Sequence, residues 1–507
     1  MTEITTSSRG GSAVFLNPLL ICALAITAAI AAWGLFDNAG LAAFSSRVVG
    51  FMFKSRGWFV MLTASTMLLV SIGLALSPYG KIRLGHDDDR PEFSTVSWLT
   101  MLFAAGMGVG LLYWGAAEPL THFEITKSIE GDQKGASAAL FITNFHWGLH
   151  AWSIYAVTAL VLAYFGFRRG CPQLISAPII ATFGRRGWTR LVGGLSDLMA
   201  IVAIAIGLGG SVAMGVFQIQ DGVVTLFGLA GDSGVLTAAI FVALVLCYLL
   251  PLMVDLGKGM ALLSNAAMAV AVVLMLYVLL AGPTAFLMSG IVESLGVYMS
   301  NVLAQGFQTY TFFDATVTDW FSAWTLTYMV WWLAWAPFVG VFIARISRGR
   351  TIREFVLGVV LVPTVFSILW FGVFGGIGFF AALRTETPIL DVVANNVSAT
   401  TFFVLEHLPL AKLTTLATVI AAFLFVVTSV VSAAYVLAMF SSQGDLNPRV
   451  RVKLIWGVLL GALALVMILS DSIAAIKSII ALGALPFVYI VLLLMVCLLK
   501  ALRTEQP

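Results

Sequence analysis

Long apolar segments separated by short polar stretches recur along the whole 507-residue chain. An α-helix needs roughly 20 apolar residues to cross the hydrocarbon core of a bilayer. Segments of that length predict twelve transmembrane helices, at residues 16–36, 58–77, 97–117, 138–165, 192–217, 234–254, 259–281, 323–344, 355–382, 411–440, 454–470 and 474–499. Two further stretches, at about 284–303 and 387–405, mix apolar and polar faces, and we expect helices along the membrane surface there. The predicted fold class is an all-α polytopic membrane protein.

The composition agrees with a membrane protein and excludes several other classes. Hydrophobic residues make up 60% of the chain, charged residues 10%, and the mean hydropathy is +1.02, far from the values of soluble globular proteins. The net charge of +3 gives no sign of a nucleic-acid partner. The four cysteines are scattered, and the sequence has no CxxC, hydrolase, kinase or metal-binding motif. We therefore expect neither an enzyme nor a cofactor.

Lysine and arginine residues are unevenly distributed over the connections between the predicted spans. Most of the 27 fall on one side of the membrane, the side that also holds the N-terminus, and the largest groups follow the fourth and eighth spans. Because basic loops are retained in the cytoplasm, this distribution predicts that both termini are cytoplasmic. The apolar run 15–36 is longer than a signal-peptide core and lacks a small-residue cleavage pattern, so we expect it to remain as the first span.

The predicted eighth span, WTLTYMVWWLAWAPFVGVFIA, carries three tryptophans on one side of a helix. At ~100° per residue, Trp331, Trp332 and Trp335 fall within about 100° of arc and form an aromatic wall. Pro337 follows them, lacks a backbone N–H and leaves the Leu333 carbonyl without its helical donor. Such a carbonyl is tolerated at membrane depth only against protein, water or an ion.

The third span contains glycines at alternate positions, Gly106, Gly108 and Gly110, and each costs up to ~1 kcal/mol in a helix relative to alanine. Two explanations remain open. The first is close helix packing through a GxxxG pair. The second is an unwound segment whose carbonyls face a substrate or ion, as in transporters built from broken helices. Glu118 ends the span, and we expect it to cap a helix or form a salt bridge rather than carry a proton.

The fourth span, FHWGLHAWSIYAVTALVLAY, carries a second aromatic wall, because Trp147, Trp152 and Tyr155 fall within about 140° of arc. An aromatic stripe alone is more typical of a core or a lipid interface, but two such walls favour a ligand site as strongly as a packing role. His146 and His150 have the i, i+4 spacing of a metal pair, yet no HExxH motif and no neighbouring acid accompany them. We expect hydrogen-bonded packing histidines.

An aromatic pocket without an acid selects a particular class of ligand. A quaternary ammonium donates no hydrogen bond and is attracted to aromatic faces by ~0.5–2 kcal/mol per ring. The two walls carry no central Asp or Glu, so a zwitterion with its own carboxylate is favoured over a cation that needs a counter-ion. Ser211 in the fifth span, together with an indole N–H, is the expected donor to that carboxylate.

The motifs around these walls resemble those of the betaine/choline/carnitine transporter family of secondary carriers. The resemblance covers nearly the whole chain and rests on PEFSTVSWLTMLFAAGMGVGLLYWGAAEPLTHF, FHWGLHAWSIY and WWLAWAPFVGVFIARISRGRTIREF. It implies a homotrimer, surrounded by membrane lipid, in a bacterial inner (plasma) membrane. It also implies two inverted five-helix repeats of the LeuT-like kind. The divisions would be two N-terminal helices in 1–96, the first repeat in 97–281, a periplasmic surface helix and loop in 282–322, the second repeat in 323–499 and a cytoplasmic C-terminus in 500–507.

The resemblance assigns roles to the aromatic residues as well. The central aromatic box of the family corresponds to four positions here, and two more flank the permeation path: Trp147, Trp152, Tyr155 and Trp332, then Trp331 and Trp335. Choline carriers of the family have an acid at the position of Gly110. The glycine therefore favours a net-neutral substrate.

Sodium-coupled members of the family imply one Na⁺ site between the third and tenth spans, at Ala104, Met107, Phe425, Thr428 and Ser429. Hard oxygen ligands suit such a cation. This sequence departs from the family pattern at two places. The fifth-span hydroxyls of a second sodium site are Ile204 and Leu208 here, which leaves only Phe338 of that site, and Val431 replaces an acid that many members carry after the tenth-span hydroxyls.

Three functions are consistent with the sequence. The leading one is a secondary transporter that imports glycine betaine or a related zwitterion, such as dimethylsulfoniopropionate, and is driven by Na⁺. The second is a sodium-independent exchanger of carnitine-like substrates, and the third is a receptor or channel that uses the same pocket without turnover. Concentrative uptake into proteoliposomes separates the first from the other two.

Overall fold

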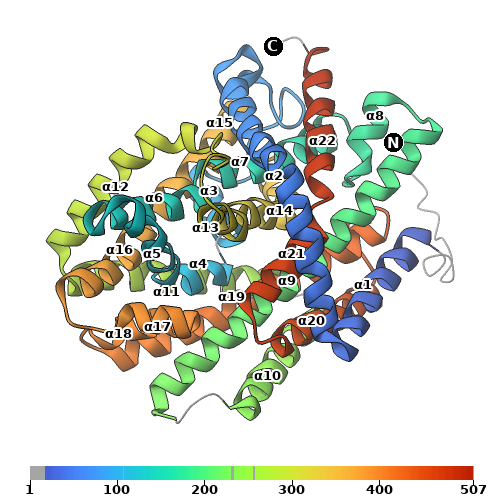
Figure 1. Cartoon of the computed structure of the whole chain (residues 1–507). Coiled ribbons are helices and arrows are strands. Elements are labelled where there is room, and N and C mark those ends of the chain that lie inside the picture. The colour runs from blue at the N-terminus through green and yellow to red at the C-terminus, as the bar shows by residue number, and fades with distance from the viewer. Residues whose placement is uncertain (1–16, 107, 230–232, 255–256, 506–507) are drawn as a thin grey trace.

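The computed structural model describes residues 17–106, 108–229, 233–254 and 257–505, and helices dominate these residues (Figure 1). The α-helices are α1 (Pro18–Phe36), α2 (Asn38–Leu76), α3 (Thr95–Gly106), α4 (Gly108–Trp114), α5 (Ala117–Glu130), α6 (Asp132–Trp147), α7 (Leu149–Ala163), α8 (Ser176–Phe183), α9 (Gly187–Phe227), α10 (Gly234–Met253), α11 (Gly257–Ala281), α12 (Thr284–Gln305), α13 (Ala315–Phe321), α14 (Thr327–Ile346), α15 (Ile352–Val356), α16 (Val362–Arg384), α17 (Ile389–Asn395), α18 (Thr400–Glu406), α19 (Ala411–Ser441), α20 (Val450–Leu469), α21 (Ile473–Ala484) and α22 (Phe487–Leu502). Short 3-10 or π-helical turns are η1 (Pro78–Lys81), η2 (Tyr164–Arg168), η3 (Ser322–Leu326), η4 (Leu357–Leu361) and η5 (Val397–Ala399).

The prediction of an all-helical, multi-pass chain is confirmed. Within the described residues, eleven helices are long and apolar enough to cross a bilayer, and the number is twelve if α21 and α22, which are bent by 41° relative to each other, form one span. The correspondence with the predicted spans is not one to one. The described residues of the predicted third span lie in α3 and α4, on either side of residue 107, and α4 ends at Trp114, whereas α12, predicted along the membrane surface, has the length and apolar character of a span.

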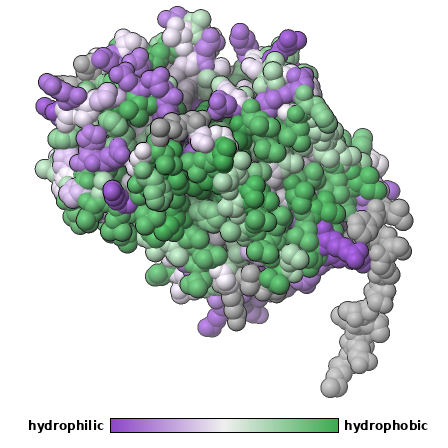
Figure 2. Space-filling model, turned by 90° about the horizontal axis from the view of Figure 1, so that it is seen from below, coloured by the Kyte–Doolittle hydropathy of each residue, from purple (hydrophilic) through white to green (hydrophobic). Residues whose placement is uncertain are grey.

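The outer surface of the molecule suits a lipid environment. Figure 2 shows a broad hydrophobic area on one face, with hydrophilic residues gathered toward its margins. Large apolar side chains are exposed on the outer helices, among them Leu250 of α10, Leu280 of α11 and Met299 of α12. An exposed apolar surface of this extent marks an interaction with lipid or protein. The chain is therefore a multi-pass membrane protein.

The centre of the molecule is formed by α7, α9, α14 and α19. Helix α7 packs along α14, and α9 packs against α14, α19 and α20. In an 18-residue apolar stretch of each of the segments 134–168 and 187–227, which contain α7 and α9, 94% of the residues are buried, compared with 28% in α1 at the edge. The central helices therefore direct their side chains toward each other, where they can line an internal site.

Several central helices are interrupted where other chain segments approach closely. A Cβ atom on Gly148, between α6 and α7, would lie 2.1 Å from the Tyr298 hydroxyl, so only glycine fits. That hydroxyl accepts a hydrogen bond from the Leu149 N–H at 2.8 Å and satisfies the first residue of α7. Pro337 does not interrupt α14, which continues through it to Ile346. The irregular turn of this segment is η3, which directly precedes α14.

Candidate functional site

An internal hollow lies between α4, α6, α7, α9 and α14 and encloses about 70 Å³. Its lining consists of Gly108, Val109, Gly110, Trp114, Trp147, Tyr155, Ser211, Met214, Tyr328, Trp331, Trp332 and Trp335. A wider hollow of about 650 Å³ lies between α6 and α12, but its lining includes charged groups such as Glu130, Lys134 and Glu293. Small-molecule sites are typically concave and apolar with a few polar groups. The inner hollow has this character and is the candidate site.

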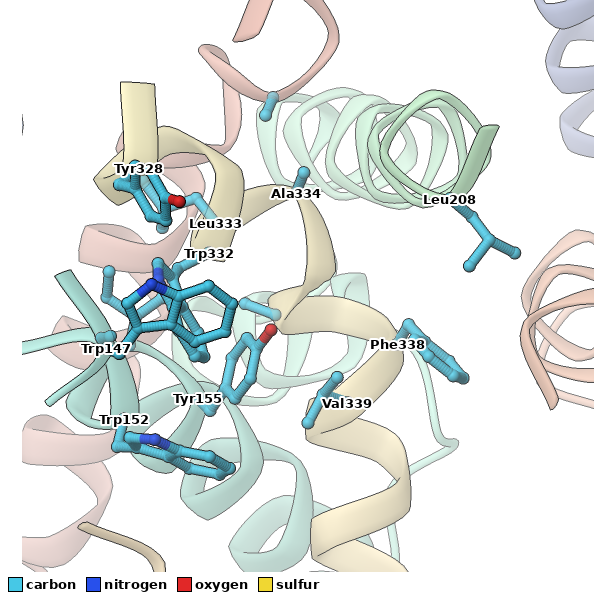
Figure 3. Packing of buried hydrophobic residues seen from close by; sticks show 14 of the residues in the cluster. Trp147, Trp152, Tyr155, Leu208, Tyr328, Trp332, Leu333, Ala334, Phe338 and Val339 are labelled. Atoms are coloured by element: carbon cyan, nitrogen blue, oxygen red, sulfur yellow. The ribbon is translucent and has the colours of Figure 1, made fainter. Parts of the chain in front are cut away.

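Trp332 lies at the centre of the aromatic residues that the sequence predicts as a box (Figure 3). Its ring centroid is 4.7 Å from that of Tyr155, 5.7 Å from Trp147 and 5.8 Å from Trp152. Trp152 is fully buried and is not part of the lining; it packs behind Tyr155 and Trp332. The structure thus brings the two predicted aromatic walls together, with Trp152 as their support.

Glycines allow these rings to approach the backbone. A Cβ atom on Gly110 would lie 3.0 Å from the Trp147 ring, and one on Gly207 would lie 3.3 Å from the Trp335 ring. Close packing, the first of the two explanations for the glycines of the third span, accounts for Gly110. The group that packs against this glycine is the Trp147 ring, not the backbone of another helix. A larger residue at position 110 would enter the hollow or displace Trp147.

Two polar groups of the hollow come from predicted residues. The Trp335 Nε1–H is buried and has no hydrogen-bond acceptor among the described residues. The Ser211 hydroxyl donates to the Gly207 carbonyl at 3.3 Å, a long bond that a better acceptor can replace. A buried donor without a partner is costly, so this side of the hollow is suited to an anionic group of a ligand.

The expectation that no acid lies near the aromatic walls is wrong. Oε2 of Glu118 accepts hydrogen bonds from Trp147 Nε1 at 2.8 Å and from the Tyr328 hydroxyl at 2.5 Å, and Oε1 lies 2.7 Å from Nδ1 of His146. The side chain is completely buried. Because α4 ends at Trp114 and a new helix begins at Ala117, Glu118 occupies the first turn of α5 and reaches the wall from a separate helix. Linear spacing does not reveal that contact.

Glu118, His122 and His146 lie close enough to share a metal ion. Hydrogen bonds explain their geometry without one. Trp320 Nε1 donates to Nδ1 of His122 at 3.2 Å, and the other ring nitrogen of His122 lies 3.4 Å from Glu118. Nε2 of His146 lies 2.9 Å from the Thr325 hydroxyl. The prediction of a hydrogen-bonded His146 is confirmed, whereas both ring nitrogens of His150 lack partners within the described chain.

Trp114, Met214 and Tyr328 also line the hollow and are not among the site residues that the sequence predicts. Tyr328 precedes Trp332 by four residues and so lies on the same face of α14, a spacing that was available as a signal. Trp114 ends α4 just before the break, and Met214 is one of many apolar residues of α9. No sequence pattern distinguishes those two from core residues.

The predicted sodium residues are only partly described. Met107 lies outside the described residues, and so does the side chain of Ala104. A Cβ atom on Gly108 would lie 3.6 Å from the Ser429 hydroxyl, so α4 and α19 are adjacent at this point. The Thr428 hydroxyl, beside buried Phe425, donates to the Leu424 carbonyl at 2.9 Å and keeps its lone pairs.

The residues that correspond to a second sodium site lie away from the rings of Trp147, Tyr155 and Trp332. Figure 3 shows Leu208 and Phe338 apart from Trp147, Tyr155 and Trp332. Leu208 and Ile204 are buried among apolar groups, and the Phe338 ring packs against Trp335 at 5.8 Å.

A multi-pass helical protein whose central helices enclose an aromatic hollow has the architecture of a membrane carrier for a small molecule. The chain belongs to the betaine/carnitine/choline family of transporters, whose family model matches residues 18–507. This confirms the family that the sequence motifs indicate, and it makes the protein a carrier of that family.

Similar proteins cover nearly the full length of the chain. The glycine betaine transporter OpuD of Bacillus subtilis is 40% identical over 495 residues, which make up 95% of this chain and 94% of OpuD. An ectoine/hydroxyectoine transporter of Virgibacillus pantothenticus is 35% identical over 453 residues, 89% of either chain. An osmo-independent choline transporter of Acinetobacter baylyi is 36% identical over 459 residues, 89% of this chain and 87% of the relative.

Proposed function

We propose that the protein imports a small zwitterion with a quaternary ammonium or sulfonium group, of which glycine betaine is the type. The observation that carries this proposal is the meeting of Trp147, Tyr155 and Trp332 in one hollow that also contains the unpaired indole N–H of Trp335. Such a pocket offers ring faces to one end of a ligand and a donor to the other.

Cation–π attraction supplies the first half of the recognition. Each ring contributes ~0.5–2 kcal/mol to binding of a quaternary ammonium. A micromolar Kd corresponds to a binding free energy of about 8 kcal/mol, so three rings supply part of the free energy that such a Kd requires. The carboxylate supplies the second half by accepting from Trp335 Nε1 and the Ser211 hydroxyl. The names of the similar transporters, for glycine betaine, ectoine and choline, support this substrate class.

We also propose that one Na⁺, held between α4 and α19, drives the import. The hydroxyls of Thr428 and Ser429 provide hard oxygen ligands next to the start of α4. A second sodium at Ile204 and Leu208 would have no side-chain oxygen to repay its dehydration. One Na⁺ with a neutral zwitterion makes transport electrogenic, with ~2.3 kcal/mol available per 100 mV.

The remaining features of the proposal follow the family and the charge distribution. We place the chain in a bacterial inner membrane as a homotrimer, with both termini in the cytoplasm and with inverted repeats in 97–281 and 323–499. Native mass spectrometry tests the trimer, because three chains of 54.2 kDa give a distinct mass. A monomer in lipid nanodiscs and in mild detergent would contradict it.

Uptake of radiolabelled glycine betaine into proteoliposomes tests the proposed function. With an inward Na⁺ gradient, we expect glycine betaine to reach a higher concentration inside the proteoliposomes than outside. With K⁺ buffer and no Na⁺ on both sides, we expect no accumulation. Uptake that needs internal substrate but no Na⁺ would identify an exchanger instead. Binding without any uptake would identify a receptor.

A further inference from the structure

A buried lysine lies against aromatic rings next to the hollow. The Lys477 ammonium of α21 is 3.1 Å from the ring centroid of Trp324, 5.0 Å from that of Trp114 and 5.8 Å from that of Tyr328. The side chain is only 8% exposed. These three rings also pack on each other, with Trp324 stacked on Tyr328 at 6.1 Å. Together they form a cage of the kind that binds ammonium groups, and the protein fills it with its own cation.

Two rings of this cage belong to the hollow as well. Trp114 and Tyr328 line the hollow and face Lys477. The cage lies at the N-terminal end of α14, about 30 Å along the helix from the arginine cluster that begins at Arg345. A ligand in the hollow and the Lys477 ammonium therefore contact the same two rings, and unit charges this near each other interact strongly in a poorly solvated interior.

Glu118 is the acid that balances this cation. Among the described residues, Lys477 has no hydrogen bond and no salt bridge, but it shares Tyr328 with Glu118: the carboxylate accepts from the Tyr328 hydroxyl, and the ammonium lies 5.8 Å from the Tyr328 ring centroid. Oε2 of Glu118 accepts hydrogen bonds from Trp147 Nε1 and the Tyr328 hydroxyl, as expected for an ionised carboxylate, and Oε1 lies 2.7 Å from Nδ1 of His146. The wall of the hollow therefore holds one acidic and one basic side chain, both buried and both in contact with Tyr328.

We infer that Lys477 is a specificity residue that excludes net cations from the hollow by cancelling the field of Glu118. The inference rests on the proposed function, since it concerns which quaternary ammonium compounds that site accepts. Glycine betaine and choline share the trimethylammonium group and differ in net charge. With Lys477 present, the wall is neutral and retains the zwitterion; without its charge, the Glu118 carboxylate attracts choline.

Binding of both ligands to the purified full-length protein in nanodiscs, measured by isothermal titration calorimetry, tests this inference. Wild type is expected to bind glycine betaine at least about tenfold more tightly than choline. Lys477→Gln removes the charge and keeps a polar side chain of similar length, and Lys477→Met provides an apolar alternative. Both are expected to lower the choline Kd relative to the betaine Kd by roughly tenfold, the size of an interaction between unit charges ~10 Å apart at an effective dielectric constant of ~20. Lys477→Arg keeps the charge and should keep the wild-type ratio.

Each outcome is decisive for one proposal. A wild-type protein that binds neither ligand refutes the proposed function. A wild type that binds choline as tightly as glycine betaine refutes the inference, and that result requires no variant to fold. Betaine binding with an unchanged ratio in Lys477→Gln and Lys477→Met also refutes it, as does loss of both ligands in variants that elute as folded protein, because the lysine would then have a structural role alone.

Discussion

At the scale of single residues, Trp332 is the ring on which the pocket depends. It contacts Tyr155, Trp147 and Trp152 and is 6% exposed. We predict that Trp332→Ala raises the Kd for glycine betaine by about tenfold or more, because one cation–π face is lost, while Trp332→Phe loses less. Calorimetry measures both. Trp188→Ala is the matched control, since that indole is 45% exposed at the start of α9; an equal effect there would contradict the prediction.

Trp335 distinguishes the two ends of the substrate. Its Nε1–H is unpaired among the described residues, so Trp335→Phe removes the donor and keeps a ring. We predict that the variant weakens glycine betaine by about tenfold, the order of a hydrogen bond to a charged group, and leaves choline, which has no carboxylate, within about twofold. Trp188→Phe controls for loss of an indole outside the hollow. Equal weakening of both ligands would show that Trp335 acts through packing.

The sequence is informative about single residues when periodicity places them on one face. Trp331, Trp332 and Trp335 share a face of α14, and the structure puts all three at the hollow. The position of Glu118 at the aromatic walls was not predicted, because its contacts there, Trp147 and Tyr328, lie 29 and 210 positions away in the chain. Tertiary proximity of a buried acid leaves no local pattern, so net charge at the site could not be read from the spans alone.

At the scale of elements, the contact of α4 with α19 is the proposed place of coupling. Thr428→Ala removes a hydroxyl beside the segment that begins at Gly108, and we predict that it raises the Na⁺ concentration for half-maximal uptake about tenfold, with a Hill coefficient near one in wild type. Proteoliposome uptake over a Na⁺ series measures this. Thr428→Ser keeps the oxygen and should stay close to wild type. Uptake at full rate without Na⁺, unchanged in Thr428→Ala, would contradict the assignment.

Hydropathy located the spans but not their interruptions. The apolar runs of α9 and α19 became single helices, whereas the predicted fourth span is broken at Gly148, between α6 and α7, and the last span bends by 41° between α21 and α22. A helix that crosses a bilayer needs a long apolar segment, and such a segment is visible in the sequence as a continuous run of apolar residues. A break depends on which groups of other helices meet the backbone, such as the Tyr298 hydroxyl at Gly148, so it cannot be recovered from a window of residues.

At the scale of the whole molecule, the segment after α22 is tied to two distant parts of the chain. Glu505 accepts hydrogen bonds from the Tyr164 hydroxyl at 2.6 Å and from Arg168 at 2.8 and 3.0 Å. Arg168 also donates to Asp87 at 2.8 Å, in the connection between α2 and α3. One arginine thus joins the loop near residue 87, the end of the fourth span and the segment around residue 505.

This connection predicts a pH dependence of stability. The hydrogen bond from Arg168 lowers the pKa of Glu505 below its usual 4.5. A carboxyl whose pKa is lower in the folded state stabilises the fold above the unfolded value and loses that contribution as pH falls through the folded value. We predict that Glu505→Gln lowers the apparent melting temperature at pH 7 by about 1–2 °C, a small effect because the pair is near the surface, and that the difference from wild type shrinks toward pH 3.5.

Differential scanning fluorimetry in nanodiscs follows both proteins. Glu406→Gln, at an exposed acid that makes no ion pair within the described chain, should show no such convergence. A gap between Glu505→Gln and wild type that stays constant from pH 7 to 3.5 would mean that the carboxylate charge does not hold this segment in place.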